Sequence, residues 1–317
     1  MKNLLVLRGG PSSEYEVSMK TGRCIIDALK DKHNVKDVVI DKNGQWVENG
    51  LEVKPDIVLR TADCALNAMH GEYGEDGVVQ QILERAGTPF TGPKVLGAKL
   101  SMNKVSAKDI FKKHGLMTPL HTVLKRTLDV EELALNLFQS FPMPAVIKPV
   151  DRGSSVDVSI VRDFKSLVET LTTLFTQHER VLIEEYIVGR EATVGVVEKF
   201  REQDIYKFLP VEIQPEGSFF DMDSKYSGKS REICPGAFSA EESLQMQEAA
   251  ALAHNILGLR HYSRSDFILN PKRGLYILET NSLPGLTNES LLPKSFEPVG
   301  WDYGSFLEHI IDLAVRE

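Results

Sequence analysis

The sequence has few cysteines and no long hydrophobic segment, and both shortages exclude classes of protein. Its three cysteines, Cys24, Cys64 and Cys234, are far apart and odd in number. They provide neither a disulfide framework nor the close spacing of a zinc site, so we expect three buried thiols. No run approaches the ~18 apolar residues of a membrane-spanning helix. The first residues, MKNLLVLRGG, lack the long apolar stretch and cleavage site of a secretion signal, and we expect a cytoplasmic protein without a membrane partner.

Positive charge is also in short supply. The chain has 37 Lys and Arg against 45 Asp and Glu, a net charge of −8. This balance argues against a nucleic-acid partner, because binding a phosphate backbone needs excess positive charge. With 42% hydrophobic and 26% charged residues, the composition is that of a globular protein, and 317 residues allow two or three domains.

The first third of the chain alternates predicted strands and helices, which indicates an α/β domain with a mainly parallel sheet. We expect strands at 4–7, 35–40, 56–59 and 65–70, and helices at 17–29 and 78–85. Gly9-Gly10 precedes a helix, whose free N–H groups attract anions, but the doublet lacks the G-x-G-x-x-G spacing of a dinucleotide site. Ligands bind at the carboxyl ends of parallel strands, so Glu14 and His70 are candidate pocket residues. The alternatives are a helix-capping acid and a structural histidine.

Two lysines in the middle of the chain are candidate phosphate ligands. A predicted helix over 101–114 carries Lys104, and a short apolar strand ends with Lys148. The glycine and serines that follow Lys148 add backbone freedom and hydroxyl donors, although the P-loop spacing is absent. A long polar segment, 214–237, is typical of a lid or binding loop.

A predicted β-hairpin near the end of the chain carries the most distinctive polar residues. The turn formers at 270–274 separate two strand-like runs. If Asn270 lies opposite Leu275, Asp266 lies opposite Glu279, whereas a slip of one residue places these carboxylates on opposite faces.

In the first register, three oxygen-bearing side chains share a face: Asp266, Glu279 and Asn281. Such a cluster suits Mg²⁺, which prefers oxygen ligands and often shares them with phosphate. The alternative is a hairpin face with ordinary exposed charges.

Five motifs follow one another along the chain: GGPSSEYEVS at 9–18, HGEYGEDGVVQ at 70–80, KPVDRGSSV at 148–156, SKY at 224–226 and ETNSLPGLTNESL at 279–291. In these motifs the chain resembles the D-alanine–D-alanine ligases of the ATP-grasp superfamily. The resemblance implies α/β and α+β structure in a three-domain ATP-grasp architecture with a Rossmann-like N-terminal (preATP-grasp) domain. The implied domains are 1–97, 98–184 and 185–317.

The resemblance also implies a reaction. The carboxylate of one D-alanine takes the γ-phosphate of ATP, and the amine of a second D-alanine attacks the resulting acyl phosphate, for peptidoglycan precursor synthesis. ATP and two Mg²⁺ (or Mn²⁺) ions are the implied cofactors, and a homodimer is the implied assembly.

The family motifs assign roles to individual residues. The implied ATP contacts are Lys104, Lys148, Ser154, Ser155, Lys225, and the adenine and ribose strand residues Glu184, Glu185, Tyr186, Ile187 and Glu191. The implied metal ligands are Asp266, Glu279 and Asn281. Arg264 and the amide of Gly285 match the oxyanion donors. The implied substrate contacts are Glu14, His70, Ser290 and the amide of Leu291, with Ser154 and Tyr226 completing a set around Glu14 under the lid.

Two residues bear on specificity and on fit to the family. Tyr226 is typical of the dipeptide-forming type, because a phenylalanine there accompanies a preference for D-lactate. Asp157 stands where the family commonly has glycine, and a carboxylate near phosphates would repel them unless it points away. Two alternatives are weighed: an ATP-grasp ligase with D-serine, D-lactate or another amino acid as second substrate, and a catalytically silent nucleotide-binding regulator. A dinucleotide-binding oxidoreductase would need a glycine fingerprint, which is missing.

Overall fold

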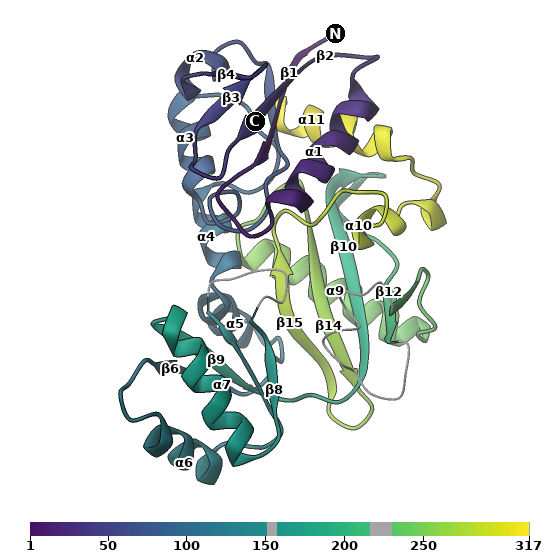
Figure 1. Cartoon of the computed structure of the whole chain (residues 1–317). Helices are drawn as coiled ribbons and strands as arrows, with labels where there is room; N and C mark the ends of the chain where they lie inside the picture. Colours follow the sequence, from purple (N-terminus) through teal and green to yellow (C-terminus); the bar gives the residue numbers. More distant parts are fainter. Residues whose placement is uncertain (151–156, 216–229, 317) are drawn as a thin grey trace.

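The computed structural model describes residues 1–150, 157–215 and 230–316. Three β-sheets organise these residues, and helices pack against each sheet (Figure 1). Among the described residues, no helix combines the length and the hydrophobicity needed to cross a bilayer. Cys64 is buried, whereas Cys24 and Cys234 are only partly buried, so the expectation of three buried thiols was wrong for two of them.

The first sheet has the strand order β4-β3-β2-β1-β5. Strand β1 lies between β2 and β5 and pairs in parallel with both, as the α/β pattern predicted, whereas β3 and β4 are added antiparallel at the β2 side. The strands are β1 (Asn3–Gly9), β2 (Asn34–Ile40), β3 (Trp46–Glu48), β4 (Leu51–Glu52) and β5 (Cys64–Asn67), and the helices are α1 (Tyr15–Leu29), α2 (Pro55–Leu59) and α3 (Val78–Ala86). The loops after β1 and β5 therefore leave the same edge of the sheet.

Two sequence predictions about local structure were wrong. Residues 56–59 form helix α2 instead of a strand. Pro55 starts this helix, where a missing N–H costs nothing, and its buried residues are the adjacent pair Val58 and Leu59. The helix predicted over 101–114 is two helices, α4 (Val95–Met102) and α5 (Lys104–Lys113), because Asn103 leaves the helical conformation and its side chain caps α5.

The second and third sheets are antiparallel. The second has the order β6-β9-β7-β8, and the third has the order β13-β12-β10-β14-β15 with β11 beside β10. Their strands are β6 (His121–Lys125), β7 (Ala145–Pro149), β8 (Ser159–Val161), β9 (Arg180–Glu185), β10 (Arg190–Phe200), β11 (Gln203–Lys207), β12 (Val211–Pro215), β13 (Ser230–Ile233), β14 (Tyr262–Asn270) and β15 (Gly274–Asn281).

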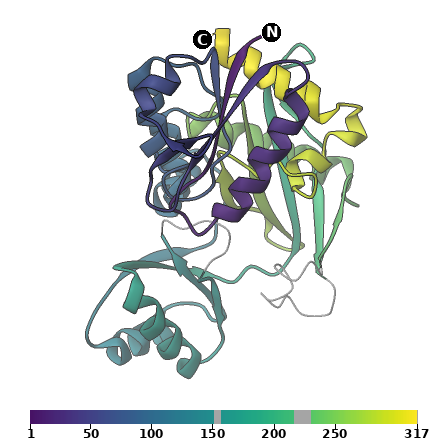
Figure 2. The same ribbon diagram turned by 45° about the horizontal axis from the view of Figure 1, so that its top comes forward.

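Helices cover both antiparallel sheets and return the chain to the first sheet. α6 (Val130–Ser140) and α7 (Phe164–Gln177) pack with the second sheet, and α9 (Ala240–Ile256) packs with the third. The last helices are α10 (Leu291–Lys294), the short 3-10 turn η1 (Glu297–Val299) and α11 (Tyr303–Arg316). α11 lies beside α1 and the first sheet, where Phe306 and Ile310 share a buried core with Leu4 (Figure 2). The two ends of the chain thus share one core.

The β14–β15 hairpin contains a register change. Asn270 lies opposite Gly274, so the predicted pairing of Asn270 with Leu275 was wrong by one residue. Gly274 has a φ of 87°, which favours glycine, and the Asn270 side chain accepts hydrogen bonds from two loop N–H groups. A β-bulge between Asp266 and Phe267 then restores the alignment, so Asp266 lies opposite Glu279 as predicted.

Candidate active site

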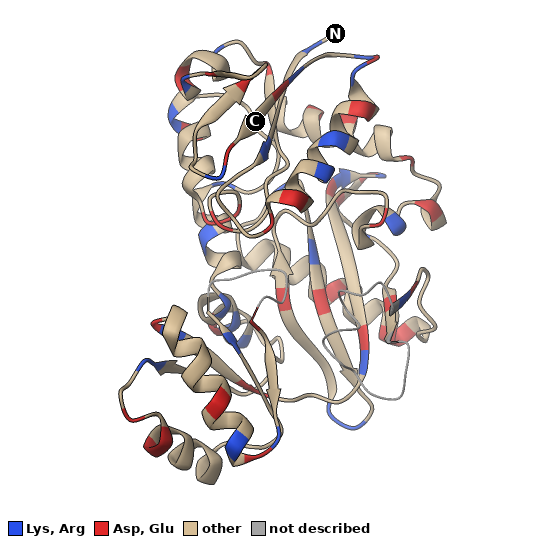
Figure 3. Ribbon diagram, viewed as in Figure 1, with Lys and Arg blue, Asp and Glu red and all other residues tan. Residues whose placement is uncertain are grey.

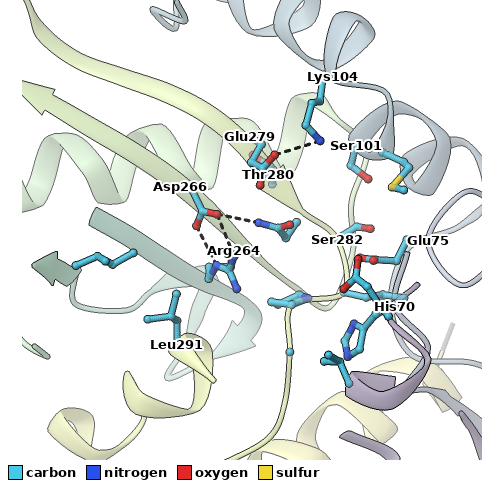
Figure 4. A pocket seen from close by; sticks show the side chains of 18 of the residues that line it. His70, Glu75, Ser101, Lys104, Arg264, Asp266, Glu279, Thr280, Ser282 and Leu291 are labelled. Atoms are coloured by element: carbon cyan, nitrogen blue, oxygen red, sulfur yellow. Dashed lines mark hydrogen bonds and ion pairs between the residues drawn. The ribbon is translucent and has the colours of Figure 1, made fainter. Parts of the chain in front are cut away.

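A cavity of about 330 Å³ lies where the loops of the first sheet meet the hairpin of the third sheet (Figure 4). Segments that are far apart in the sequence line it. Nine residues singled out from the sequence contribute to its wall: Glu14, His70, Lys104, Arg264, Asp266, Glu279, Asn281, Gly285 and Leu291. The cavity therefore joins the loops after β1 and β5, the α4–α5 break and the end of the hairpin in one place.

Asp266 is the centre of a hydrogen-bonded cluster at the hairpin. Arg264 donates to its two oxygens through Nε at 2.9 Å and Nη2 at 3.0 Å. Asn281 Nδ2 donates to Asp266 Oδ2 at 3.1 Å, and Thr193 Oγ1 donates to Oδ1 at 2.6 Å. Burial opposes the charge on Arg264, but Asp266 outweighs it, and the pKa of the guanidinium is raised. Basic and acidic positions accordingly lie side by side on the central strands of the third sheet (Figure 3).

Glu279 faces the same space from β15. Its Oε2 lies 3.4 Å from the Nζ atom of Lys104, at the start of α5. Among the described residues, no group of three acidic, histidine or cysteine side chains is placed to hold a metal ion. The oxygen donors at the hairpin are two carboxylates and the amide of Asn281, a set that suits Mg²⁺ when phosphate oxygens complete its coordination.

Lys148 lies outside the cavity wall and belongs to a buried ion-pair network with Glu184 and Lys108. The Nζ atom of Lys148 is 2.9 Å from Glu184 Oε2, and that of Lys108 is 3.0 Å from Glu184 Oε1. Burial alone would raise the pKa of Glu184, but the two lysines lower it to about 2. Burial lowers the pKa of Lys108 to about 8, although Glu184 opposes the change. The single carboxylate of Glu184 therefore forms ion pairs with both lysines.

Sequence reasoning missed Lys108. The signal available was its position four residues after Lys104, which places both lysines on one face of α5. Its side chain is fully buried and also donates to Thr118 Oγ1 at 2.8 Å.

The strand and linker matched to adenine and ribose lie beside the hairpin. The Glu185 carboxylate accepts from both terminal nitrogens of Arg273, in the hairpin loop, at 2.8 and 3.1 Å. The N–H of Tyr186 donates to the carbonyl of Pro144, and Glu191 lies on β10 opposite Ile268. Ile187 is buried in an apolar cluster with Ile268, Tyr276 and Leu278. This cluster spans the junction between the second and third sheets.

Gly285 and Ser290 pack closely at the far end of the cavity. A Cβ built on Gly285 would lie 2.8 Å from Ser290 Oγ, so a larger residue here would displace the Ser290 hydroxyl. The Oγ atom of Ser290 accepts a hydrogen bond from the Thr287 N–H at 3.1 Å. Ser290 is the residue that immediately precedes α10. Four residues assigned from the motifs lie outside the described residues: Ser154, Ser155, Lys225 and Tyr226.

His70 and Glu75 line the other end of the cavity. His70 is buried, its Nε2 lies 2.9 Å from Thr21 Oγ1, and burial lowers the pKa of its ring to about 4. The imidazole is therefore neutral near pH 7. Glu75, which sequence reasoning did not select although it stands within the HGEYGEDG motif, has its pKa raised to about 8 by burial and then by Glu14.

Comparisons with known proteins give the chain its class. Two family models match it: the one described as the D-ala D-ala ligase N-terminus covers residues 3–57, and the one described as the D-ala D-ala ligase C-terminus covers residues 110–312. Among solved structures, a D-alanine–D-alanine ligase from Bacillus anthracis complexed with ATP is 31% identical, with a TM-score of 0.80 over 100% of this chain and 98% of that chain. The fold and the site define an ATP-grasp enzyme.

Curated relatives refine this class. A D-alanine–D-alanine ligase from Geobacter sulfurreducens is 36% identical over 96% of this chain and 92% of that relative. One from Lawsonia intracellularis is 36% identical over 99% of both chains. The chain belongs to the D-alanine–D-alanine ligase family.

Proposed function

We propose that this protein joins two molecules of D-alanine into D-alanyl-D-alanine with the use of ATP, as a cytoplasmic step of peptidoglycan precursor synthesis. The observation that carries the proposal is the shared cavity. It brings the substrate-side residues Glu14 and His70 to the same wall as the phosphate-side residues Lys104, Asp266 and Glu279. A nucleotide-binding regulator without catalysis would have no need for this convergence.

ATP lies between the second and third sheets in this proposal. The apolar cluster around Ile187 contacts the adenine, and the end of β9 with the linker that follows it, Glu184 to Ile187, supplies backbone partners. Glu191 accepts hydrogen bonds from the ribose. Lys104 and Lys148 bind the phosphates, because each ammonium already lies against a carboxylate that fixes its position.

The metal ligands would be Asp266, Glu279 and Asn281, which fit two Mg²⁺ (or Mn²⁺) ions by their oxygen chemistry. The ions, when bound, screen the repulsion between the phosphates and the substrate carboxylate. A carboxylate is a poor electrophile, and phosphorylation gives it a leaving group.

The remaining residues bind and orient the two amino acids. Glu14 binds the ammonium of the first D-alanine. Arg264 and the N–H of Gly285 donate to the oxyanion that forms when the second amine attacks. Ser290 and the N–H of Leu291 bind the carboxylate of the second D-alanine. In this proposal four further residues complete the site, and all of them lie outside the described ranges: Ser154, Ser155, Lys225 and Tyr226.

The three sheets support a three-domain division at 1–97, 98–184 and 185–317, which we propose together with a homodimer. The second candidate function is ligation of D-alanine to another second substrate. It is favoured by one comparison: VanG, a D-Ala:D-Ser ligase from Enterococcus faecalis, is 26% identical and superposes with a TM-score of 0.86 over 99% of both chains.

The direct test is phosphate release from ATP and Mg²⁺ with D-alanine, compared with L-alanine and with D-alanine plus D-serine or D-lactate. Mass spectrometry identifies the products. We expect release only with D-alanine present and D-alanyl-D-alanine as the main product. A mixed product would support the second candidate, and no release that depends on a D-amino acid would contradict both.

Asp157 provides a further prediction, because its carboxylate pairs with a neighbouring histidine. Asp157 Oδ2 lies 3.2 Å from His178 Nε2. Asp157→Asn is expected to leave the KM for ATP within about twofold, since an engaged, partly exposed charge acts weakly on phosphates. Its φ of 59° is tolerated by asparagine.

Steady-state kinetics with varied ATP measure the effect, with Lys148→Met as the control that raises KM. A KM that falls more than about fivefold in Asp157→Asn would show that the native carboxylate repels the phosphates, since a change of that size exceeds what most exposed charges contribute.

A further inference from the structure

Two carboxyl groups converge at one end of the cavity, and the function proposed above employs only one of them. Glu75 Oε2 accepts a hydrogen bond from the Gly71 N–H at 2.6 Å. The same glycine approaches the other carboxyl group, because a Cβ built on Gly71 would lie 3.3 Å from Glu14 Oε1. Both glutamates line the cavity, and Figure 4 shows Glu75 beside His70. Glu14 and Glu75 are therefore close neighbours around one backbone position.

The surroundings disfavour two negative charges at this place. The ionisable groups that act on the pKa of Glu75 are Glu14 and Arg264, and Glu75 in turn raises the pKa of Tyr262. His70 offers no positive charge near pH 7, because burial keeps its ring neutral. Arg264 lowers the pKa of Glu75 only weakly, and it already donates two hydrogen bonds to Asp266. Burial and the charge of Glu14 outweigh it.

We propose that Glu75 is a second carboxyl group of the ammonium site, and that Glu14 and Glu75 hold one proton between them until the ammonium of the first D-alanine displaces it. This inference rests on the proposed function of the same cavity. The exchange balances: the ammonium enters with its charge and its three protons, the shared proton leaves to solvent, and two carboxylates face one cation. An ammonium can donate to both carboxylates at once, whereas a single proton bridges them with one hydrogen bond.

The exchange makes D-alanine binding release a proton. The empty site keeps its proton below about pH 8, the value to which the pKa of Glu75 is raised. Bound ammonium lowers that pKa, because an opposite charge favours the ionised carboxyl group. Release therefore approaches one proton per D-alanine near pH 7 and declines above about pH 8. In the range of full release, the affinity for D-alanine rises about tenfold per pH unit, and it levels off above about pH 8.

Isothermal titration of the intact protein with D-alanine, in the presence of ADP and Mg²⁺, tests the exchange at pH 7. Two buffers with different ionisation enthalpies report the number of protons released. We expect wild-type protein to release nearly one proton and Glu75→Gln to release almost none. The matched control is Glu16→Gln, which removes an exposed carboxylate of α1 outside the cavity wall and should behave as wild type.

Each outcome decides the inference. A wild-type heat that is the same in both buffers overturns it while leaving the proposed function intact, because D-alanine still binds. Proton release that persists undiminished in Glu75→Gln also overturns it. If Glu75→Gln does not fold, Glu75→Ala carries the comparison, because it likewise removes the carboxyl group that holds the shared proton. Wild-type protein that binds no D-alanine at all contradicts the proposed function itself.

Discussion

Replacing Arg264 by methionine is expected to lower kcat by about 10²–10³-fold, the usual cost of removing one oxyanion donor. The guanidinium lines the cavity and is fixed by two hydrogen bonds to Asp266. A fixed donor needs no reorganisation when charge develops on the reacting carbon's oxygen. ATP binding should change much less, because Lys104 and Lys148 remain in place.

Single-turnover kinetics and nucleotide titration separate these two effects. Arg264→Lys should retain part of the activity, since it keeps the charge but loses the planar fork of donors. The matched control is Arg180→Met, because Arg180 is exposed at the start of β9. A kcat for Arg264→Met within about tenfold of wild type would exclude the arginine as the principal oxyanion donor.

Glu184→Gln is expected to lower the free energy of unfolding by about 3–5 kcal/mol, the typical cost of breaking a buried ion pair by removing one partner. Glu184 is 2% exposed, and its carboxylate oxygens lie 3.0 Å from the Nζ atom of Lys108 and 2.9 Å from that of Lys148. Without it, Lys108 and Lys148 face each other without a counter-charge. Urea unfolding at pH 7 measures the loss.

A second substitution makes the test specific to the network. Lys108→Met in the Glu184→Gln background should recover part of the lost stability, because it removes one of the two stranded charges. The control is Glu179→Gln, which removes an exposed carboxylate and should cost less than about 1 kcal/mol. If Glu184→Gln loses no more stability than this control, the network does not stabilise the fold.

The pH dependence gives an independent check on Glu184. Its pKa in the folded protein, about 2, lies below the ordinary glutamate value of 4.5. The carboxylate therefore contributes stability that is complete above about pH 4.5 and lost as the pH falls toward 2. Acid unfolding of wild-type protein should include this loss, and Glu184→Gln should lack it.

Lys108 adds an effect of opposite direction in the alkaline range. Its pKa is about 8 in the folded protein, and removal of Glu184 lowers it further. Folded Glu184→Gln protein therefore binds fewer protons than folded wild-type protein in this range. Its free energy of unfolding rises more steeply with pH, and the stability difference between the two proteins narrows as the pH rises from 7 to 9.

The local motifs were sufficient to predict the family and the order of the principal elements. Few local structures suit Gly9-Gly10 at the end of an apolar run, and a strand followed by a turn is one of them. Turn formers between two apolar strands likewise favour a hairpin. Short segments were less certain. The short apolar run at 56–59 suits either a strand or one helical turn. Pro55 at the first helical position and the burial of the adjacent Val58 and Leu59 favour the helix. Asn103 similarly turned one predicted helix into two.

The sequence by itself determined which residue types the site would contain, because hairpin carboxylates, strand-end lysines and glycine turns carry their chemistry locally. Only the tertiary structure decided which of them act on one another. The bulge beside Asp266 aligns it with Glu279 despite a hairpin tip shifted by one residue. The burial that lowers the pKa of Lys108 and raises that of Glu75 comes from segments far away in the chain. Electrostatic strength depends on distance and on the exclusion of water, and packing alone sets both.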